Sequence, residues 1–343
     1  MSTVAINGFG RIGRLFFRQA IKAKDVQVVA INDLGDIENL AYLLRYDSVY
    51  GKLDAKVEVA EKTAAGGVLM CEGKRVVFTQ VKDPSVLPWK KMNIDIVVES
   101  TGVFESYEQA QVHLKAGAKR VVITAPAKDE DGEGRKTILM GVNEEHLKTC
   151  LISSNGSCTT NAAAAVAQVL SENPGILKAS LNTVHGYTAT QNLVDGPTRG
   201  KDFRRGRAGA HNIVPSSTGA AISVTRAIPG LVGKFDGIAL RVPTLTGSIA
   251  DITFLAKRKT SVEEINDILT RASQEPRWQG ILKVTQDQIV SSDIVGEPYG
   301  AIVDLQSTRV VDGDLVKVLS WYDNEWGYVA TLMKHVQALA ATI

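Results

Sequence analysis

Short apolar runs alternate with amphipathic segments along the first 126 residues of the chain. Within the segment 12–23, Ile12, Phe16 and Ala20 recur at steps of four residues, which places them on one face of a helix. The strands predicted in this part lie at residues 4–6, 26–31, 76–78, 94–102 and 120–126, and a second helix lies at 107–116. Because helices alternate with strands that are apolar throughout, the pattern predicts a doubly wound parallel sheet of the α/β class.

A different pattern follows residue 178, where strands succeed one another with few helices between them. Strands are predicted at residues 179–185, 235–242, 247–256, 301–305 and 315–321, and helices at 261–273 and 328–341. Ser261 and Glu264 form a Ser-x-x-Glu capping box at the start of the first of these helices. Runs of strands of this kind predict an α+β domain built on a mostly antiparallel sheet.

The composition excludes several classes of protein. With 343 residues the chain is long enough for two domains. Its formal net charge of +2 creates no strong field for nucleic acid, which we do not expect as a main partner. No apolar run reaches the ~20 residues that span a bilayer, and the N-terminus lacks the pattern of a signal peptide. The three cysteines, Cys71, Cys150 and Cys158, have no CxxC spacing, so we expect a reduced, cytoplasmic protein with neither disulfides nor a metal site.

Residues 8–13 read Gly-Phe-Gly-Arg-Ile-Gly, a G-x-G-x-x-G turn between the first predicted strand and helix. Gly8 and Gly10 allow a tight turn and the close approach of a pyrophosphate, and Gly13 lets the helix pack on the strand. Asp33 lies 20 residues after Gly13, where a carboxylate can accept hydrogen bonds from both ribose hydroxyls of an adenosine. Together these features predict a Rossmann-type dinucleotide-binding unit. We expect NAD as the cofactor, because Asp33 would repel the 2′-phosphate of NADP.

Cys158 lies between Ser157 and Thr159, shortly before the alanine-rich run 162–167. Alanine has the highest helix propensity and hydroxyl side chains cap helix N-termini, so we expect Cys158 in the first turn of a helix. The unpaired N–H groups and the dipole at that position favour a thiolate, which is the nucleophilic form. A lone cysteine is often an inert core residue instead. The flanking hydroxyl groups favour a reactive sulfur beside an anionic substrate.

His185 ends the predicted strand 179–185, 27 residues beyond Cys158. A histidine in this place could hold the thiolate and exchange a proton with the substrate, although single histidines are more often structural. The loop 186–210 follows directly and is dense in glycine and arginine, including Arg199 and Arg205. Loops of this length inside compact domains are usually functional.

Six motifs occur in order along the chain. They are Asn-Gly-Phe-Gly-Arg-Ile-Gly-Arg at 7–14, Ser-Cys-Thr-Thr-Asn at 157–161, His-Gly-Tyr-Thr at 185–188, Pro-Ser-Ser-Thr-Gly-Ala-Ala at 215–221, Arg-Val-Pro-Thr at 241–244 and Tyr-Asp-Asn-Glu-Trp-Gly-Tyr at 322–328. In this combination the chain closely resembles the phosphorylating glyceraldehyde-3-phosphate dehydrogenases over essentially its whole length. The resemblance implies NAD-dependent oxidation and phosphorylation of glyceraldehyde 3-phosphate to 1,3-bisphosphoglycerate, in glycolysis or gluconeogenesis, by a homotetramer.

The resemblance also implies the roles of individual residues. Cys158 would be the nucleophile that forms a thiohemiacetal and then a thioester, and His185 would activate it and accept a proton. The residues implied for the substrate's own phosphate are Thr188 and Arg241, those for the attacking inorganic phosphate are Ser157, Thr159, Thr218 and Gly219, and Arg205 matches an arginine near both anions.

The cofactor residues implied by the resemblance are Gly8, Gly10, Arg11, Ile12, Gly13, Asp33, Lys82, Thr124 and Asn324, with Asn324 at the carboxamide of NAD. The implied domains are an NAD-binding domain over residues 1–157, completed by the C-terminal helix at about 325–343, and a catalytic and substrate domain over residues 158–324. No metal is implied.

Two other functions remain open at this point. Erythrose-4-phosphate dehydrogenases are similar in fold and mechanism but release their acid by hydrolysis, and they usually vary the Ser-Ser-Thr-Gly and His-x-Tyr-Thr motifs that this chain keeps. An RNA-binding protein on the same fold is the other alternative. The net charge of +2 and the complete set of catalytic motifs disfavour that as the main role.

Overall fold

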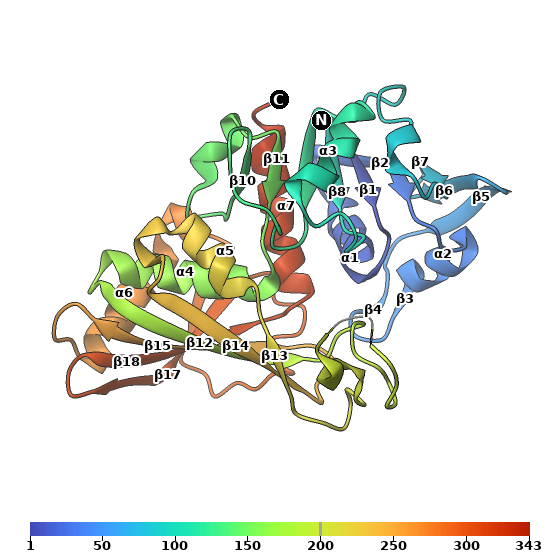
Figure 1. The fold of residues 1–343 in the computed structure, drawn as a ribbon. Coiled ribbons are helices and arrows are strands. Elements are labelled where there is room, and N and C mark those ends of the chain that lie inside the picture. Colours follow the sequence, from blue (N-terminus) through green and yellow to red (C-terminus); the bar gives the residue numbers. More distant parts are fainter. Residues whose placement is uncertain (199–200) are drawn as a thin grey trace. The chain divides into compact units, whose positions relative to one another are not determined.

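The computed structural model describes residues 1–198 and 201–343, and it divides the chain into two compact units (Figure 1). The first unit comprises Met1–Ile138, Asn143–Gly156 and Leu332–Ile343, and the second comprises Leu139–Val142 and Ser157–Thr331. Arg199, one of the two loop arginines noted above, lies outside the described residues.

The described part of the first unit holds a nine-stranded sheet in the order β10-β11-β9-β8-β1-β2-β7-β6-β5. Its strands are β1 (Ser2–Asn7), β2 (Val26–Asn32), β5 (Val57–Thr63), β6 (Gly66–Cys71), β7 (Lys74–Thr79), β8 (Ile96–Glu99), β9 (Arg120–Ile123), β10 (Arg135–Thr137) and β11 (Ile152–Ser154). All pairs from β10 to β7 are parallel, while β6 pairs antiparallel with both β7 and β5. The prediction of a doubly wound, mostly parallel sheet is therefore confirmed, and an antiparallel edge is added to it.

The helices α1 (Arg11–Ala20), α2 (Ile37–Arg45) and α3 (Tyr107–Lys115) belong to the first unit, as does the small hairpin of β3 (Tyr46–Asp47) and β4 (Gly51–Lys52). Helix α1 begins directly after the glycine turn, as predicted. Gly8 has a φ of 94°, and a Cβ there would lie 2.6 Å from the backbone nitrogen of Thr101. Only glycine therefore fits this turn, which brings the backbone of β1 close to the segment that follows β8.

In the second unit, the described residues form a seven-stranded sheet in the order β13-β14-β12-β15-β18-β17-β16. Its strands are β12 (Ile176–Gly186), β13 (Val214–Ser217), β14 (Phe235–Val242), β15 (Ser248–Ala256), β16 (Leu282–Thr285), β17 (Ala301–Val311) and β18 (Leu315–Tyr322). The β12–β14 and β16–β17 pairs are parallel and the others are antiparallel. The mostly antiparallel sheet predicted for this half is confirmed.

Helices α4 (Cys158–Glu172), α5 (Ala220–Ala227) and α6 (Val262–Gln274) lie on one face of this sheet (Figure 1). Ser261 accepts a hydrogen bond from the N–H of Glu264, so the predicted N-cap of α6 is confirmed. Residues 162–167 of α4 are at most 1% exposed and belong to the core cluster of the unit. Small alanine side chains let this helix approach the sheet closely, and the close packing fixes the position of its first turn.

Helix α7 (Trp326–Ala340), predicted as the closing helix, carries a fully buried histidine in its first-unit part. The Nδ1 atom of His335 lies 3.2 Å from Asn155 Nδ2, and its Nε2 lies 2.7 Å from Ser153 Oγ. Because the amide nitrogen only donates, Nδ1 accepts and Nε2 carries the hydrogen that Ser153 accepts. Burial lowers the pKa of His335 to about 4, so the ring is neutral in the folded chain.

This neutral histidine predicts a loss of stability in mild acid. The unfolded chain takes up a proton at His335 below its ordinary pKa of about 6.5, while the folded chain resists protonation down to about 4. The free energy of unfolding is thus fully retained above pH 6.5 and falls by roughly 2 kcal/mol between pH 7.5 and pH 5 on account of this residue. His335→Gln should remove that part of the pH dependence in urea unfolding curves. His211→Gln, which changes an exposed histidine, should leave the pH dependence of wild type intact.

Candidate active site

Cys158 is the first residue of α4, the position predicted for it. Ser157 is the N-cap, and its Oγ accepts a hydrogen bond from the N–H of Thr160 while Thr160 Oγ1 accepts from the N–H of Ser157. This reciprocal capping box fixes the entry of the chain into the helix. The residue Cys158 is partly exposed, whereas Cys71 and Cys150 are buried.

The structure brings His185 to Cys158. Strand β12 passes under α4 in the core cluster, and its inward-facing residues Leu181 and His185 are buried. The Nε2 atom of His185 lies 3.3 Å from Cys158 Sγ, and its Nδ1 lies 2.6 Å from the carbonyl oxygen of Gly186. A nucleophile, a base within hydrogen-bond distance and a group that orients the base are the parts that nucleophilic catalysis requires.

The pKa values of this pair differ from the expectation of a stabilised thiolate. Burial raises the pKa of the Cys158 thiol, and the charge of Arg241 and hydrogen bonds from Thr159 only partly oppose that rise. Burial and then the charge of Arg241 lower the pKa of His185 to about 3. The N–H groups of the first helical turn lower the pKa of the thiol, but burial outweighs them, so the expected lowering of this pKa is not met. The geometry instead suits a neutral thiol whose proton moves to His185 during attack.

Two residues that sequence reasoning missed support the pair from β18 and β12. The hydroxyl of Tyr322 lies 2.8 Å from Thr159 Oγ1 and 2.7 Å from Thr183 Oγ1. Its ring meets the ring of His185 edge-on, with 6.0 Å between centroids. Burial raises the pKa of Tyr322 above its ordinary value, so the phenol stays neutral and holds the imidazole and the first turn of α4 in place. The strict alternation of inward residues along residues 179–185 was the one signal that could have identified Thr183.

Arg241 lies against the far side of His185. The parallel pairing of β12 with β14 places the two residues opposite each other, and Arg241 Nη1 lies 2.6 Å from His185 Nδ1. Thr188, predicted to share an anion with Arg241, lies just after β12, where its Oγ1 is 2.9 Å from Thr190 Oγ1. Burial lowers the pKa of Arg241, and the positive charge of Arg205 lowers it further, while Cys158 and Tyr322 oppose that shift.

The other predicted anion-binding residues lie in the long loop and between β13 and α5. Arg205, in the long loop, donates through Nε and Nη2 to Ser216 Oγ at 2.9 and 2.6 Å. Gly219 is the N-cap of α5, and Thr218 Oγ1 accepts from the N–H of Ala220 at 3.1 Å. These residues are partly or fully exposed, so their donors can meet an anion from solvent. Thr159 differs, because the residue is 4% exposed and its hydroxyl is hydrogen-bonded to Tyr322, which leaves mainly its backbone N–H for an anion.

The glycine turn of the first unit borders a cavity of about 490 Å³. The residues that line it are Asn7, Gly8, Gly10, Asn32, Asp33, Leu34, Val81, Lys82, Pro84, Ser100, Thr101, Val103 and Phe104. Asp33 Oδ2 accepts from the N–H of Phe9 at 2.6 Å and Oδ1 accepts from the N–H of Gly35 at 2.7 Å. Both carboxylate oxygens are thereby oriented and keep lone pairs for ribose hydroxyls. A Cβ on Gly10 would meet no atom within 4 Å, so this turn leaves space for a pyrophosphate.

Of the predicted cofactor residues, Gly8, Gly10, Asp33 and Lys82 line this cavity, while others lie elsewhere. Arg11 pairs with Asp47, Ile12 and Gly13 lie within α1, and Thr124 Oγ1 donates to the carbonyl of Glu99 at 3.0 Å. In the second unit, Asn324 Oδ1 accepts from the N–H of Gly247 and from Ser248 Oγ. These two hydrogen bonds fix the orientation of the Asn324 amide, so its nitrogen is placed to donate a hydrogen bond to a carboxamide.

Glu99, which the sequence did not single out, lies buried beneath the glycine turn. Its Oε2 accepts from Asn7 Nδ2 at 2.6 Å and lies 2.9 Å from His113 Nε2. Its Oε1 accepts from the N–H of Thr101 at 2.8 Å. Because Asn7 and Thr101 both line the cavity, this carboxylate fixes two walls of the predicted cofactor site.

The chain matches two parts of one protein family. Residues 2–107 match the family described as "Glyceraldehyde 3-phosphate dehydrogenase, NAD binding domain", and residues 157–324 match "Glyceraldehyde 3-phosphate dehydrogenase, C-terminal domain". The chain is 50% identical over 331 residues to the glyceraldehyde-3-phosphate dehydrogenase of Thermotoga maritima, a match that covers 96% of each. It is 47% identical over 327 residues to that of Geobacillus stearothermophilus, covering 95% of this chain and 94% of the relative. Identity to the enzyme of Streptomyces coelicolor is 45% over 328 residues, with the same coverage.

Proposed function

Because the chain belongs to the glyceraldehyde-3-phosphate dehydrogenase family and is an NAD-dependent oxidoreductase, we propose that it converts glyceraldehyde 3-phosphate and phosphate to 1,3-bisphosphoglycerate. One observation carries the proposal. The Sγ atom of Cys158, in the first turn of α4, lies 3.3 Å from His185 Nε2. The erythrose-4-phosphate and RNA-binding alternatives draw no support from the names of these relatives.

The reaction begins with proton transfer inside the Cys–His pair. The lone pair of His185 Nε2 takes the S–H proton of Cys158, and the thiolate attacks the carbonyl carbon of the aldehyde. A C–S bond forms, the π electrons of the carbonyl move to its oxygen, and the proton on Nε2 passes to that oxygen. The N–H groups in the first turn of α4 and the Nε2–H group stabilise the oxygen while it is negative. The product is a thiohemiacetal on Cys158.

Oxidation converts the thiohemiacetal to a thioester. When bound, NAD would supply the acceptor for the hydride of the C–H bond. His185 Nε2 would take the hydroxyl proton of the thiohemiacetal, so that the C=O bond forms again as the hydride departs. His185 is suited to this step because its lowered pKa keeps a free lone pair at neutral pH.

Phosphorolysis then releases the product. An oxygen of inorganic phosphate attacks the thioester carbon, the C–S bond breaks, and the sulfur of Cys158 leaves and takes back its proton from His185. We assign Ser157, Thr218, Gly219 and the backbone N–H of Thr159 to the attacking phosphate, with Arg205 nearby. Helix N-termini with hydroxyl caps are suited to this task because their N–H groups point toward an anion.

Two substitutions should separate the two phosphate sites. Thr218→Ala should raise the KM for inorganic phosphate roughly tenfold, since it removes one hydrogen bond to a charged ligand, and it should spare thioester formation. Arg241→Ala should lower kcat/KM for glyceraldehyde 3-phosphate relative to unphosphorylated glyceraldehyde by ~10²-fold, because a buried charge pair with the substrate is lost. Steady-state NADH formation measures both.

Ser217→Ala is the matched control, because it removes the hydroxyl of a neighbouring residue. Arg205 donates to the backbone carbonyl of Ser217, which the substitution keeps. It should leave both parameters close to wild type. Equal loss of phosphate dependence in all three variants would contradict the assignment of the sites.

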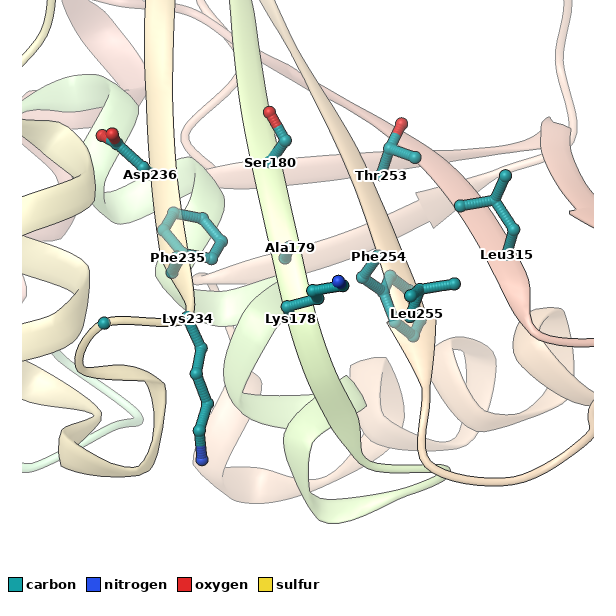
Figure 2. Close-up of a pocket in the computed structure, with 11 residues that line it drawn as sticks. Lys178, Ala179, Ser180, Lys234, Phe235, Asp236, Thr253, Phe254, Leu255 and Leu315 are labelled. Atoms are coloured by element: carbon teal, nitrogen blue, oxygen red, sulfur yellow. The ribbon is translucent and has the colours of Figure 1, made fainter.

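We further propose a homotetramer. In β15 the residues Ile252 and Phe254 face the helices, so the alternate residues Thr253 and Leu255 point to the opposite face of the sheet. Figure 2 shows this face, where side chains of β12, β14, β15 and β18 border a hollow of about 720 Å³. Exposed apolar side chains occur on this unit, among them Ile238, Leu193 and Phe203 at 55%, 82% and 79% exposure. Exposed apolar surfaces of this kind are suited to contacts with further copies of the chain. Light scattering should give the mass of four chains in solution, and a mass of one or two chains would contradict the tetramer.

Among the described residues, no helix is long and apolar enough to cross a membrane. All three cysteines are free thiols. A cytoplasmic location remains part of the proposal, because a nucleophilic thiol needs a reducing compartment to stay active. Fractionation with a labelled chain would test it.

A further inference from the structure

Both oxygens of the Asp33 carboxylate are held by backbone N–H groups at the edge of the cofactor cavity. Oδ2 accepts from Phe9 at 2.6 Å, and Oδ1 accepts from Gly35 at 2.7 Å. Hydrogen bonds from N–H groups to an ionised carboxylate are short and strong. Turning the carboxylate away from the cavity breaks them, so Asp33 presents its negative charge in one fixed place.

The chain on the amino-terminal side of Asp33 is fixed by the segment at the end of β7. Asn32 Nδ2 donates to the carbonyl of Val81, and the N–H of Val81 donates back to Asn32 Oδ1, both at 2.9 Å. The N–H of Asp33 itself donates to the carbonyl of Thr79 at 3.1 Å. These bonds hold Asn32 and Asp33, whereas the donor to Oδ1 belongs to Gly35, which needs a contact of its own.

The side chain of Gln80 supplies that contact. Its Nε2 donates to the carbonyl oxygen of Gly35 at 2.9 Å, and the backbone N–H of Gln80 donates to the carbonyl of Ala65 at 3.1 Å. Gln80 is half-buried, so its bond to Gly35 is partly shielded from water. Gln80 therefore limits the movement of the residue whose N–H holds Asp33 Oδ1.

Position 35 also has to be small. A Cβ on Gly35 would lie 3.1 Å from Asp33 Oδ1 and 3.1 Å from Leu40 Cδ1, so a neighbour would have to move by a few tenths of an ångström. Because Leu40 is buried in close-packed surroundings, the half-exposed carboxylate is the group that moves more easily. Glycine at this position thus keeps Oδ1 within reach of the N–H group.

The place of this charge decides between the two nicotinamide cofactors. Lys82 lines the same cavity as Asp33, so a cation that attracts the 2′-phosphate of NADP lies in the site together with an anion that repels it. A mobile Asp33 side chain would turn away from that phosphate and leave Lys82 to bind it. A fixed Asp33 cannot turn away, and the two like charges then repel each other at close range.

We propose that Gln80 and Gly35 determine the selectivity for NAD over NADP by holding the Asp33 carboxylate in place. Both are positioning residues that act through Asp33. Gln80 fixes the carbonyl of Gly35, and Gly35 donates to Oδ1 and leaves room for it. The inference rests on the cofactor site of the first unit and is independent of which aldehyde the enzyme oxidises.

Calorimetric titration of the complete enzyme, stripped of nucleotide, measures this selectivity without turnover, as the dissociation constant of NADP divided by that of NAD. Gln80→Ala should lower this ratio roughly tenfold, the effect of one lost hydrogen bond that orients a charged group. Binding of NAD should weaken, while binding of NADP should stay equal or become stronger. Gly35→Ala should lower the ratio as well, because its Cβ displaces Oδ1.

Asp33→Ala shows whether these effects pass through the carboxylate. It removes the charge itself, so it should lower the ratio most, and adding Gln80→Ala to it should lower the ratio no further. Glu38→Gln is the matched control, because it removes a nearby carboxylate of α2 that pairs with Lys62 instead. It should keep the wild-type ratio.

Thermal melts show which variants are folded, and Gln80→Ala decides alone if Gly35→Ala does not fold. A loss of affinity by the same factor for NAD and NADP would mean a merely structural role and would overturn the inference. A further fall of the ratio when Gln80→Ala is added to Asp33→Ala would overturn it too. NADH formation from glyceraldehyde 3-phosphate, assayed on the same samples, tests the proposed function separately. A changed ratio without turnover in wild type would support the selectivity role and reject the function, and turnover with an unchanged ratio would do the reverse.

Discussion

Replacing Cys158 with serine is expected to reduce NADH formation by roughly 10⁴–10⁶-fold, the range seen when a catalytic nucleophile is removed. A serine hydroxyl is far harder to deprotonate than a thiol, so the same imidazole would activate serine much less effectively. The fold should survive, because the residue is partly exposed and the cap of α4 is formed by Ser157 and Thr160. A single-turnover absorbance trace with enzyme in excess over substrate measures the loss directly.

Cys150→Ser is the matched control for this substitution. Cys150 is buried, its thiol donates to the carbonyl of Ile152 at 3.1 Å, and burial raises its pKa to about 11. A serine can keep that hydrogen bond, so activity should stay close to wild type. Inactivation by iodoacetamide should follow labelling of Cys158. If it followed labelling of Cys71 or Cys150 instead, Cys158 would not be the nucleophile.

The second large effect concerns the base. His185→Asn should slow hydride transfer ~10²–10⁴-fold at neutral pH, the usual contribution of a general base. Without the imidazole, attack depends on spontaneous ionisation of a thiol whose pKa burial raises. The rate of the variant should therefore rise with pH across the neutral range, because each pH unit increases the small thiolate fraction. Stopped-flow measurement of the first turnover separates this step from phosphorolysis.

His211→Asn changes an exposed histidine just after the long loop and provides the comparison. Its first turnover should match wild type at every pH. A His185→Asn enzyme that transferred hydride at the wild-type rate at neutral pH would show that the thiol ionises without a base, and the proton-transfer scheme would have to be abandoned.

Apolar strands flanked by recognisable turns could be predicted from sequence, and polar elements could not. Strands β1 and β2 were predicted within a few residues because most of their apolar residues are buried in the sheet. The edge strand β5 was missed because most of its side chains are exposed and polar, so no apolar pattern marks it. Helix α2 was missed although the sequence carried its signal, because the buried residues Ile37, Leu40, Ala41 and Leu44 have helical spacing after the N-cap Asp36.

The candidate site shows the same division between local and distant interactions. The position of Cys158 in the first helical turn depends on neighbours within six residues, so it could be predicted from the sequence. The contacts of His185 with Arg241 and Tyr322 depend on strand pairing between segments far apart in the chain. No local pattern specifies such a register. The pKa of the thiol was mispredicted because the helix N-terminus is visible in the sequence, whereas the burial that outweighs it arises only from packing.

The amount of NADH formed in the first turnover, with and without phosphate, tests most directly whether a Cys158 thioester is an intermediate that phosphate resolves. Enzyme saturated with NAD and glyceraldehyde 3-phosphate in phosphate-free buffer should release a burst of about one NADH per active site and then nearly stop. Addition of phosphate or arsenate should restore steady turnover at once. Sustained turnover at full rate without either anion would mean that water resolves the thioester, and the enzyme would be hydrolytic.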